Sequence, residues 1–320
     1  MKIWNSNLRR ARGSTLLAVF WLTSILGVAL FAVLTLIDFE TDLVVTHTES
    51  KRAGHFAEMG IAIGAHSSVE RDDPLLNFNA PDGAGGYRCR LFSENDRFDI
   101  NALLLNQDVE QDDKGWLREV FYDWGMELDE AQELVDALVD WVDAGELEEL
   151  NGAEAPYYED LGFPDRPFNR PFYSLDEMEF VRGVDRLEAL NPGWKDFFTI
   201  WTQGGVDINE ASPQMIALAL DIQPEEAEIV TQTVRGADGI LGTQDDAPFN
   251  SVDEAFGPSG LAAVDELTFN LNSHRLTTDG TTTRIESTGW SGEAKRRVTL
   301  IIRNREGTPT LLERREEVIN

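Results

Sequence analysis

The sequence has little cysteine, little histidine and few cations. A single cysteine, Cys89, excludes an internal disulfide framework and any zinc site built on several cysteines. Four histidines scattered over 320 residues argue against a histidine cluster. Lys and Arg number 27 against 58 Asp and Glu, so the formal net charge is −31. Nucleic-acid phosphates are bound by clustered cations, and this charge therefore argues against nucleic-acid binding and favours basic partners or cations such as Ca²⁺.

Catalytic fingerprints are lacking as well. The sequence contains no G-x-S-x-G, P-loop, H-E-x-x-H or Gly-rich dinucleotide motif. His55 and His66 fall on an expected helix and His274 on an expected strand, without a Cys or Ser arrangement for nucleophilic catalysis. Carboxylate pairs arise by chance among 58 acids. We therefore expect a protein that is not an enzyme.

The charge that is present falls into three regimes. Residues 1–13 carry four cations and no acid, whereas residues 93–270 carry 42 acids and 9 bases, a net charge of −33. The stretch from Arg284 to Arg305 is locally basic. Three charge regimes indicate at least three structural regions.

An apolar run without any charge occupies residues 14–37. A helix needs about 20 residues to cross the hydrocarbon core, so this run is long enough. The cations in residues 1–13 predict a cytoplasmic N-terminus, with everything after Asp38 on the opposite side. A secretory signal peptide is the alternative, but its apolar core has about 7–15 residues and ends in a small-x-small site. We therefore expect a membrane anchor whose helix continues to about Ser68.

The leader and the start of this run resemble a known signal. Arg9-Arg10-Ala11-Arg12-Gly13 before an apolar helix resembles the class III signal of type IV pilins, which a prepilin peptidase cuts after the Gly. The resemblance implies cleavage between Gly13 and Ser14. Ala18 stands fifth after the cut, where major pilins and most pseudopilins have Glu. That departure resembles the minor pseudopilin K family of type II secretion systems.

The middle of the chain carries the most specific resemblance. Residues 134–158 read LVDALVDWVDAGELEELNGAEAPYY, which is similar to the D-A-hydrophobic-x-D-W-x-D and G-A-E-x-x-Y-Y segments of the K family. Apolar residues at helical spacing, among them Trp116, Phe121 and Trp141, predict helices from about 112 to 189. We expect these aromatic side chains to form the core.

Residues 206–234 resemble a helix-hairpin-helix. Such modules bind DNA elsewhere through a Gly-rich hairpin whose backbone amides meet phosphate. Here residues 220–226 have no Gly and three acids, so phosphate would be repelled. We expect a structural or protein-binding use. A membrane-anchored helix-hairpin-helix DNA-binding receptor remains the alternative function.

The first candidate Ca²⁺ site is a Gly-punctuated loop after this unit. Ca²⁺ takes about 6–8 oxygen ligands, and the loop can supply carboxylates and carbonyls. Its spacing does not match an EF-hand, and a solvated Asp-Gly turn is the alternative. The candidate ligands are Asp238, Asp245, Asp246 and Asp253.

A second, weaker candidate consists of Asp140, Asp143 and Glu154. Carboxylates near a helix C-terminus meet the unfavourable end of its dipole, and a bound cation would relieve that repulsion. A solvated acidic face is the alternative. The resemblance to the K family implies calcium in the inserted helical domain without assigning ligands.

The remaining segments predict strands. Residues 87–91 and 98–101 read as one hairpin. Residues 268–277, 281–290 and 297–303 read as consecutive antiparallel strands, because Asp-Gly and Ser-Gly turns separate them. These strands would form one sheet interrupted by the acidic helical region, and the tail after Asn304 would be loosely ordered.

The expected fold class is α+β, with a pilin-like long N-terminal transmembrane helix packed on an antiparallel sheet and a large, mostly helical insertion. The expected parts are a basic prepilin leader (1–13), the transmembrane helix (14–37), the helix continuation with the first hairpin (38–105), the inserted acidic helical domain (106–266), the C-terminal strands (267–304) and a charged tail (305–320).

The resemblance implies a non-enzymatic minor pseudopilin at the tip of the type II secretion pseudopilus, where it starts assembly for protein export. The implied partners are minor pseudopilins I and J, the prepilin peptidase, the inner membrane and exported substrates, with no nucleic acid. The implied location is the inner membrane, crossed once, with a cytoplasmic N-terminus, a periplasmic C-terminal domain and methylation as a modification.

Overall fold

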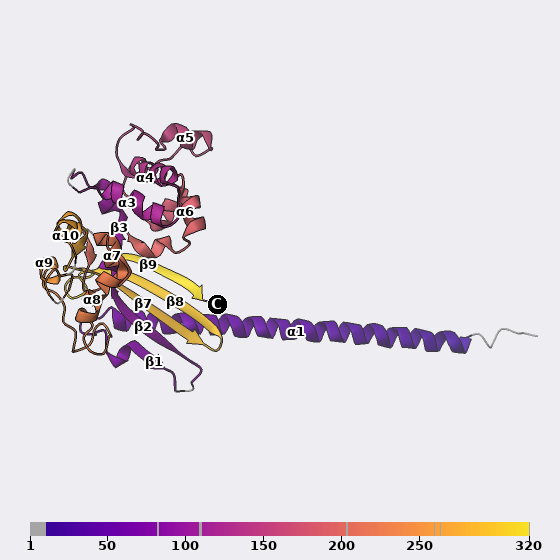
Figure 1. Ribbon diagram of the computed structural model, residues 1–320. Coiled ribbons are helices and arrows are strands. Elements are labelled where there is room, and N and C mark those ends of the chain that lie inside the picture. The colour runs from indigo at the N-terminus through magenta and orange to yellow at the C-terminus, as the bar shows by residue number, and fades with distance from the viewer. Residues whose placement is uncertain are drawn as a thin grey trace, which may run out of the picture.

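The computed structural model describes residues 11–81, 83–108, 111–202, 204–258, 260–262 and 264–319. It contains a long N-terminal helix, an antiparallel sheet on which the second half of that helix packs, and a helical insertion at the far end from the N-terminus (Figure 1). The fold class expected from the sequence is confirmed. The first ten residues of the leader lie outside the described residues.

The long helix α1 (Ala11–Gly64) has two different halves. Its 54 residues make a rod of about 80 Å at 1.5 Å per residue. Large apolar side chains from Leu16 to Val45 are exposed, and α1 is the one helix in the described part that is long and apolar enough to cross a membrane. Further along, Ala53 and Ala57 are fully buried against the sheet.

The main sheet has five antiparallel strands in the order β1-β2-β7-β8-β9. Alternation along the strands places Cys89, Ile285 and Val298 on the face that α1 covers, where they form a core with Ile61. The strands are β1 (Asn77–Asn79), β2 (Gly85–Ser93), β7 (Thr282–Ser291), β8 (Ala294–Arg303) and β9 (Thr310–Ile319).

Glycines let α1 lie unusually close to the sheet. A Cβ on Gly60 would overlap the Ser287 hydroxyl, and one on Gly289 would overlap the backbone of Ala53. The helix and strand β7 therefore meet through main-chain surfaces. This close approach fixes the direction in which α1 leaves the sheet.

The insertion lies between β2 and β7 and has one continuous apolar core. Two short parallel pairs, β3 (Phe98–Asp99) with β4 (Phe198–Thr199) and β5 (Val206–Asp207) with β6 (Leu276–Thr277), stand at its base. Its α-helices are α2 (Ile100–Leu105), α3 (Asp113–Asp123), α4 (Leu128–Val142), α5 (Ala155–Asp160), α6 (Val184–Leu190), α7 (Pro213–Leu220), α8 (Pro224–Val234), α9 (Val252–Ala255) and α10 (Glu266–Asn272). Short 3₁₀ helices are η1 (Pro74–Leu76), before the insertion, and η2 (Glu94–Asp96), η3 (Leu175–Phe180), η4 (Trp194–Phe197) and η5 (Ser273–Arg275), within it.

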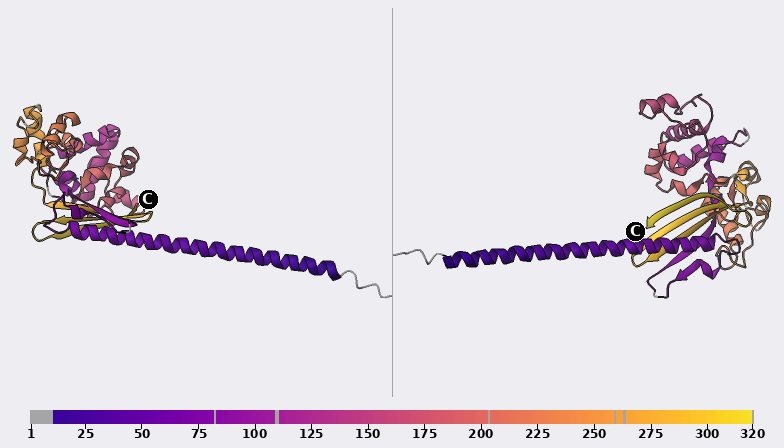
Figure 2. Two further views of the ribbon diagram at one scale, coloured as in Figure 1. Left: turned by 90° about the horizontal axis from the view of Figure 1, so that it is seen from below. Right: turned by 180° about the vertical axis from the view of Figure 1, so that it is seen from behind.

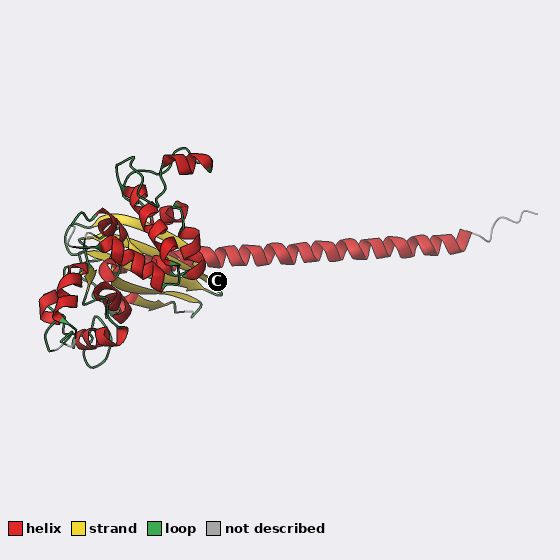
Figure 3. Ribbon diagram, turned by 45° about the horizontal axis from the view of Figure 1, so that its top comes forward, coloured by secondary structure: helices red, strands yellow, loops and turns green. Residues whose placement is uncertain are grey.

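The insertion and α1 lie on opposite faces of the sheet (Figures 2 and 3). The helices form two groups, α3 to α6 and α7 to α10, which share the core (Figure 1). The aromatic residues expected in the core are there: Phe121 and Trp141 are fully buried and Trp116 nearly so.

The expected hairpin of residues 87–91 with 98–101 is wrong. Strand β2 pairs with β1 and β7 instead, and Phe98–Asp99 pairs in parallel with β4, about a hundred residues later. The chain cannot continue as a strand because the Asp99 carboxylate accepts the Ala102 N–H and so begins α2.

Two further strand expectations at the C-terminal end need correction. Residues 268–277 form α10, η5 and only a two-residue strand, because Asp265 accepts the N–H groups of Leu267 and Thr268 and begins a helix. The tail expected to be loosely ordered contains β9, which pairs along β8. The strands β7 and β8 are joined at Ser291-Gly292 as expected, with Gly292 at φ 56°.

Candidate functional site

The expected processing site lies at the start of α1. The cleavage position between Gly13 and Ser14 falls within the helix, but the surroundings of both residues lie outside the described part. Ala18 is exposed on the apolar half of α1. Its methyl group offers a neighbouring chain no charge.

The second acidic constellation stands at the end of α4. This helix begins with a capping box between Glu127 and Glu130 and buries Leu134 and Trp141 on one face. From Leu134 to Val142 the helix is buried on all sides, and the Asp140 side chain within this stretch is fully buried. Burial of the whole helix end therefore places one carboxylate of this constellation next to apolar groups. We call Asp140, Asp143 and Glu154 the Asp140 centre.

The loop after α4 folds back onto the Asp140 carboxylate. Oδ1 accepts the backbone N–H of Glu149 at 3.0 Å, and Oδ2 accepts that of Ala153 at 2.8 Å. Gly152 permits this approach, because a Cβ there would overlap Asp140 Oδ2. Asp143 lies at the start of the loop and accepts the N–H of Gly145 at 2.9 Å.

Glu154 completes the Asp140 centre and is only 4% exposed. Burial raises its pKa, and the nearby carboxylates of Asp140 and Asp143 raise it further. Burial likewise raises the pKa of Asp140, against the two backbone hydrogen bonds that lower it. Glu154 Oε1 is buried without a hydrogen-bond partner in the described part of the chain. A buried, unpaired carboxylate oxygen next to other acids is where a bound cation would be most stabilising.

The first acidic constellation is a different kind of structure, which we call the Asp245 loop (residues 236–246). The exposed Asp245 carboxylate accepts the N–H groups of Ala237 at 2.7 Å and Asp238 at 3.2 Å and the hydroxyl of Thr243 at 2.8 Å. These hydrogen bonds lower the pKa of Asp245. Asp246 accepts the N–H of Gly242 at 2.6 Å. The carboxylates of Asp245 and Asp246 therefore accept hydrogen bonds from the backbone of their own loop and stabilise its turn.

The four candidate ligands of the first site do not converge. Asp238 accepts the N–H of Ile240, and Asp253 is exposed in the first turn of α9. Over the residues that the structure describes, no group of three or more Asp, Glu, His or Cys side chains is placed to hold one metal ion. Calcium binding at either constellation remains a prediction.

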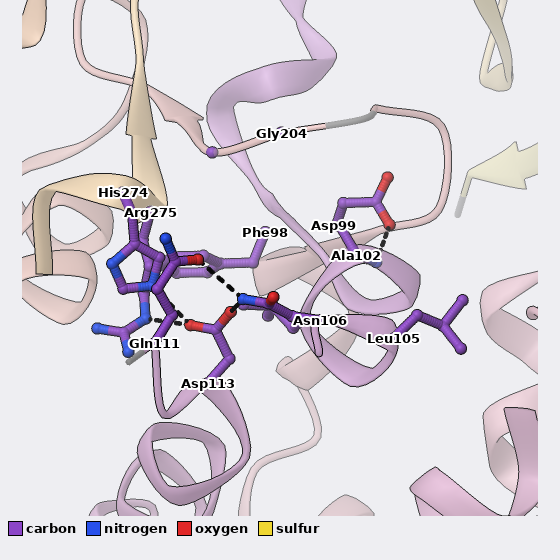
Figure 4. A pocket seen from close by; sticks show the side chains of 12 residues that line it. Phe98, Asp99, Ala102, Leu105, Asn106, Gln111, Asp113, Gly204, His274 and Arg275 are labelled. Carbon is purple, nitrogen blue, oxygen red and sulfur yellow. Dashed lines mark hydrogen bonds and ion pairs between the residues drawn. The ribbon is translucent and has the colours of Figure 1, made fainter. Parts of the chain in front are cut away.

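A cavity of about 300 Å³ lies where the two helical groups meet the base of the insertion (Figure 4). Asp113 at the start of α3 accepts hydrogen bonds from His274 Nε2 at 2.9 Å and Arg275 Nε at 2.8 Å, and Asn106 donates to its other oxygen at 2.7 Å. Burial opposes ionisation, but these donors and the Arg275 charge outweigh it and lower the pKa of Asp113.

The sequence does not predict this cluster of Asp113, His274 and Arg275. Asp113 and Arg275 are 162 positions apart, and a second buried ion pair joins Arg284 Nη1 on β7 to Glu94 Oε2 at 2.7 Å. Asp99 on the far side of α2 accepts the Ala102 N–H, and burial raises its pKa to about 6 (Figure 4). The Asp113 cluster joins the two helical groups of the insertion, and the Arg284–Glu94 pair fastens the start of the insertion to β7. No local sequence pattern marks either cluster.

The segment that resembles a helix-hairpin-helix forms α7 and α8. The turn between them contains Asp221 in the left-handed conformation at φ 57°, and Gln223 and Glu226 form the capping box of α8. No glycine in the turn frees backbone amides for a phosphate. The two helices instead bury Ile216 and Val230 in the core of the insertion.

Comparison with known proteins finds a family match for the region that contains the Asp140 centre. Residues 96–192 match the family model for type II secretion system (T2SS), protein K. Type II secretion system protein K of Pseudomonas aeruginosa is 28% identical over 174 residues, which make up 54% of this chain and 51% of that protein. The resemblance to protein K is confirmed. The chain spans about half the length of this curated protein K relative.

A solved structure extends the likeness to most of the fold. A chain in the crystal structure of the GspK-GspI-GspJ complex from the enterotoxigenic Escherichia coli type 2 secretion system matches with a TM-score of 0.60. The match covers 88% of this chain and 98% of that chain at 16% identity. The match shows that the fold is shared over that part of the chain.

Proposed function

We propose that this protein is a non-enzymatic minor pseudopilin of a type II secretion pseudopilus. The observation that carries the proposal is the divided α1, whose first half exposes apolar side chains for a membrane or neighbouring helices while its second half is fixed to the sheet. The match of residues 96–192 to protein K supports the choice of machine. The chain would cross the inner membrane once, with the leader cytoplasmic and the sheet and insertion periplasmic.

We infer a tip position from two features of the chain. Ala18 offers no carboxylate to neutralise the N-terminal amine of a subunit ahead of it in the filament. The insertion also occupies the end of the molecule farthest from the start of α1, where a subunit ahead would have to pack (Figure 1). Both features suit a subunit that starts assembly for protein export together with minor pseudopilins I and J.

The test is complex formation by the full chain in detergent micelles with purified minor pseudopilins I and J from the same genome. We expect the three proteins to elute together in size-exclusion chromatography. Replacement of Trp21 by Arg in the exposed half of α1 should weaken the complex, whereas Ile240→Arg in the Asp245 loop should not. Separate elution of all three wild-type chains would contradict the proposal.

The alternative, a membrane-anchored DNA receptor, is tested on the same preparation. A gel-shift with double-stranded DNA at low salt should show no complex, because acids surround the α7–α8 turn. Tight binding that weakens as salt rises would replace the pseudopilin assignment of the insertion.

We also propose that the Asp140 centre binds Ca²⁺. The buried, unpartnered Glu154 Oε1 is the observation that favours it over the Asp245 loop, whose carboxylates are used by their own backbone. Over the described residues the three carboxylates are not placed to hold one ion together. Glu154 Oε1 would therefore be the first ligand, and Asp140, Asp143 and carbonyls of the 143–154 loop would join it only after the loop adjusts around the ion. The ion would neutralise the end of α4 and hold this loop closed.

The calcium proposal is tested by thermal unfolding of the full chain with Ca²⁺ and with a chelator. We expect Ca²⁺ to raise the melting temperature by several degrees, because a ligand that binds only the folded state stabilises it. Glu154→Gln should abolish the rise. Asp238→Ala combined with Asp245→Ala, the matched control, should retain it. The reverse pattern would move the site to the Asp245 loop.

A further inference from the structure

The face of the sheet opposite α1 is covered over only part of its length. Near the far end of α1, the underside of the insertion packs on it: Trp201 donates to Glu313 Oε2 at 2.6 Å, and Arg303 donates to the Trp201 carbonyl at 2.9 Å. Nearer to the membrane-facing end, a groove of about 510 Å³ is open over β2, β7 and β8. We call this groove the basic groove.

Four cations line the basic groove in two rows. Arg88 and Arg90 extend from β2, and Lys295 and Arg297 extend from β8, with β7 between the rows. In the described part of the chain none of these four side chains makes an ion pair or a side-chain hydrogen bond. Glu286, the acid in the groove, is occupied by Arg284 at 3.0 Å.

Four unpaired cations are notable on a chain with a net charge of −31. The chain holds more than twice as many acids as bases, and most other described cations near the sheet have a carboxylate partner, such as Arg296 with Glu316 at 3.1 Å. Trp290 lies half-buried at the end of the groove on β7. Arg and Trp are the residue types that contribute most to protein interfaces.

The spacing of the cations selects the shape of a partner. Neighbouring strands are about 4.8 Å apart, so the two rows are separated by about 10 Å, close to the diameter of an α-helix. Within a row, residues two apart on a strand are separated by about 6.8 Å, and residues four apart in a helix rise by about 6 Å. Carboxylates at positions i and i+4 on both flanks of a helix therefore match both rows.

We propose that the basic groove binds an acidic α-helix of a partner protein, laid along β7 with carboxylates on both flanks and an apolar side chain on Trp290. The sheet already accepts a helix on its other face, where α1 packs. The insertion limits the length of the bound helix, because Trp201 and its neighbours block the end of this face that is far from the groove.

Anionic lipid is the other class of ligand for such a groove, and its position argues against it. Arg296 donates to Ser50 Oγ at 3.0 Å, so the near end of β8 lies beside that part of α1. The residues from Asp38 to Glu49 separate this level from the apolar run by about 18 Å of helix. Asp38, Glu40 and Asp42 occupy that stretch and would be repelled by anionic headgroups.

The test is fluorescence anisotropy of the full chain in nonionic micelles with a labelled, Ala-based helical peptide that has Glu at i and i+4 on both flanks and one central Leu. We expect saturable binding that weakens at least about tenfold as salt is raised from about 50 to 500 mM. The comparison peptide has the same composition in scrambled order and should bind at least about tenfold more weakly.

Variants of the groove decide whether binding occurs there. Arg88→Gln with Lys295→Gln should weaken peptide binding at least about tenfold, because one cation is lost from each row. Lys114→Gln with Arg235→Gln removes the same charge from the insertion and should leave binding unchanged. Equal binding of the scrambled peptide, equal loss in both double variants, absence of binding, or a preference for phosphatidylglycerol vesicles would each overturn the proposal.

Discussion

The Asp140 centre and the Asp245 loop are alike in the sequence and differ in the structure. Each consists of closely spaced acids near glycines. Asp140 and Glu154 are buried behind α4, whereas Asp245 is exposed. Burial raises the pKa of the first pair, and hydrogen bonds lower the pKa of Asp245. Acid density alone therefore does not define a cation site, because the environment decides whether a negative charge is already stabilised.

The largest expected difference between the two regions is in stability. Asp140→Ala leaves two N–H groups of the folded-back loop without their acceptor, so it should lower the unfolding free energy by about 2–4 kcal/mol. Asp245→Ala opens an exposed turn where water replaces the lost acceptor, so its cost should be much smaller. Denaturant unfolding in micelles measures both. Equal losses would mean that the loops are equally exposed in solution.

A second prediction extends the comparison to Asp99, a buried acid outside both constellations. Burial raises its pKa from 3.8 to about 6, so the folded state holds its proton over a pH range in which the unfolded chain has lost it. Unfolding free energy should therefore fall as pH rises from about 4 to 6, by up to about 3 kcal/mol at 1.4 kcal/mol per unit.

Asp99→Asn should flatten this part of the pH profile, because the amide does not titrate, and its oxygen still accepts the Ala102 N–H. The measurement is denaturant unfolding at a series of pH values. Asp123→Asn, at the exposed end of α3, is the matched control and should leave the profile unchanged. An unaltered slope in Asp99→Asn would show that this carboxyl is hydrated in solution.

The smallest expected effect is on how unfolding free energy depends on pH, measured with a chelator present. Glu154 and Asp245 should contribute slopes of opposite sign. The raised pKa of Glu154 contributes stability in acid that is lost as pH rises through its folded pKa, so Glu154→Gln should make the profile less steep there. The lowered pKa of Asp245 contributes stability at neutral pH that is lost as pH falls, so Asp245→Asn should reduce the loss in acid. Slope changes of the same sign would remove the distinction between the two regions.

Local patterns in the sequence were sufficient for several parts of the fold. The apolar run of residues 14–37 lies in α1, and the Ser291-Gly292 turn joins β7 to β8. The buried positions of Phe121 and Trp141 also agree with their helical spacing. In each of these parts the deciding interactions join residues within a few turns or one hairpin, so periodicity and turn chemistry describe them adequately.

Other parts depend on contacts between distant residues. Phe98–Asp99 was expected in a hairpin but pairs with β4, and the charged tail contains β9 because β8 offers it a free edge. The sequence favours the Asp245 loop as the cation site, and only the fold shows that Glu154 Oε1 is buried with no hydrogen-bond partner among the described residues. The sequence gives the number of charged side chains, but it does not show how far each of them is removed from solvent on folding.

The sequence by itself determined the membrane-type helix, the acidic helical insertion, the α+β class and the resemblance to protein K. The tertiary structure decided which acids are buried and which half of the sheet remains open. It also decided that Arg284 with Glu94 fastens the insertion to β7 and that Arg275 with Asp113 joins its two helical groups. The physical reason is the separation along the chain of the residues whose interactions decide each feature. Helix and turn formation depend on neighbours along the chain, whereas desolvation and ion pairing depend on neighbours in space.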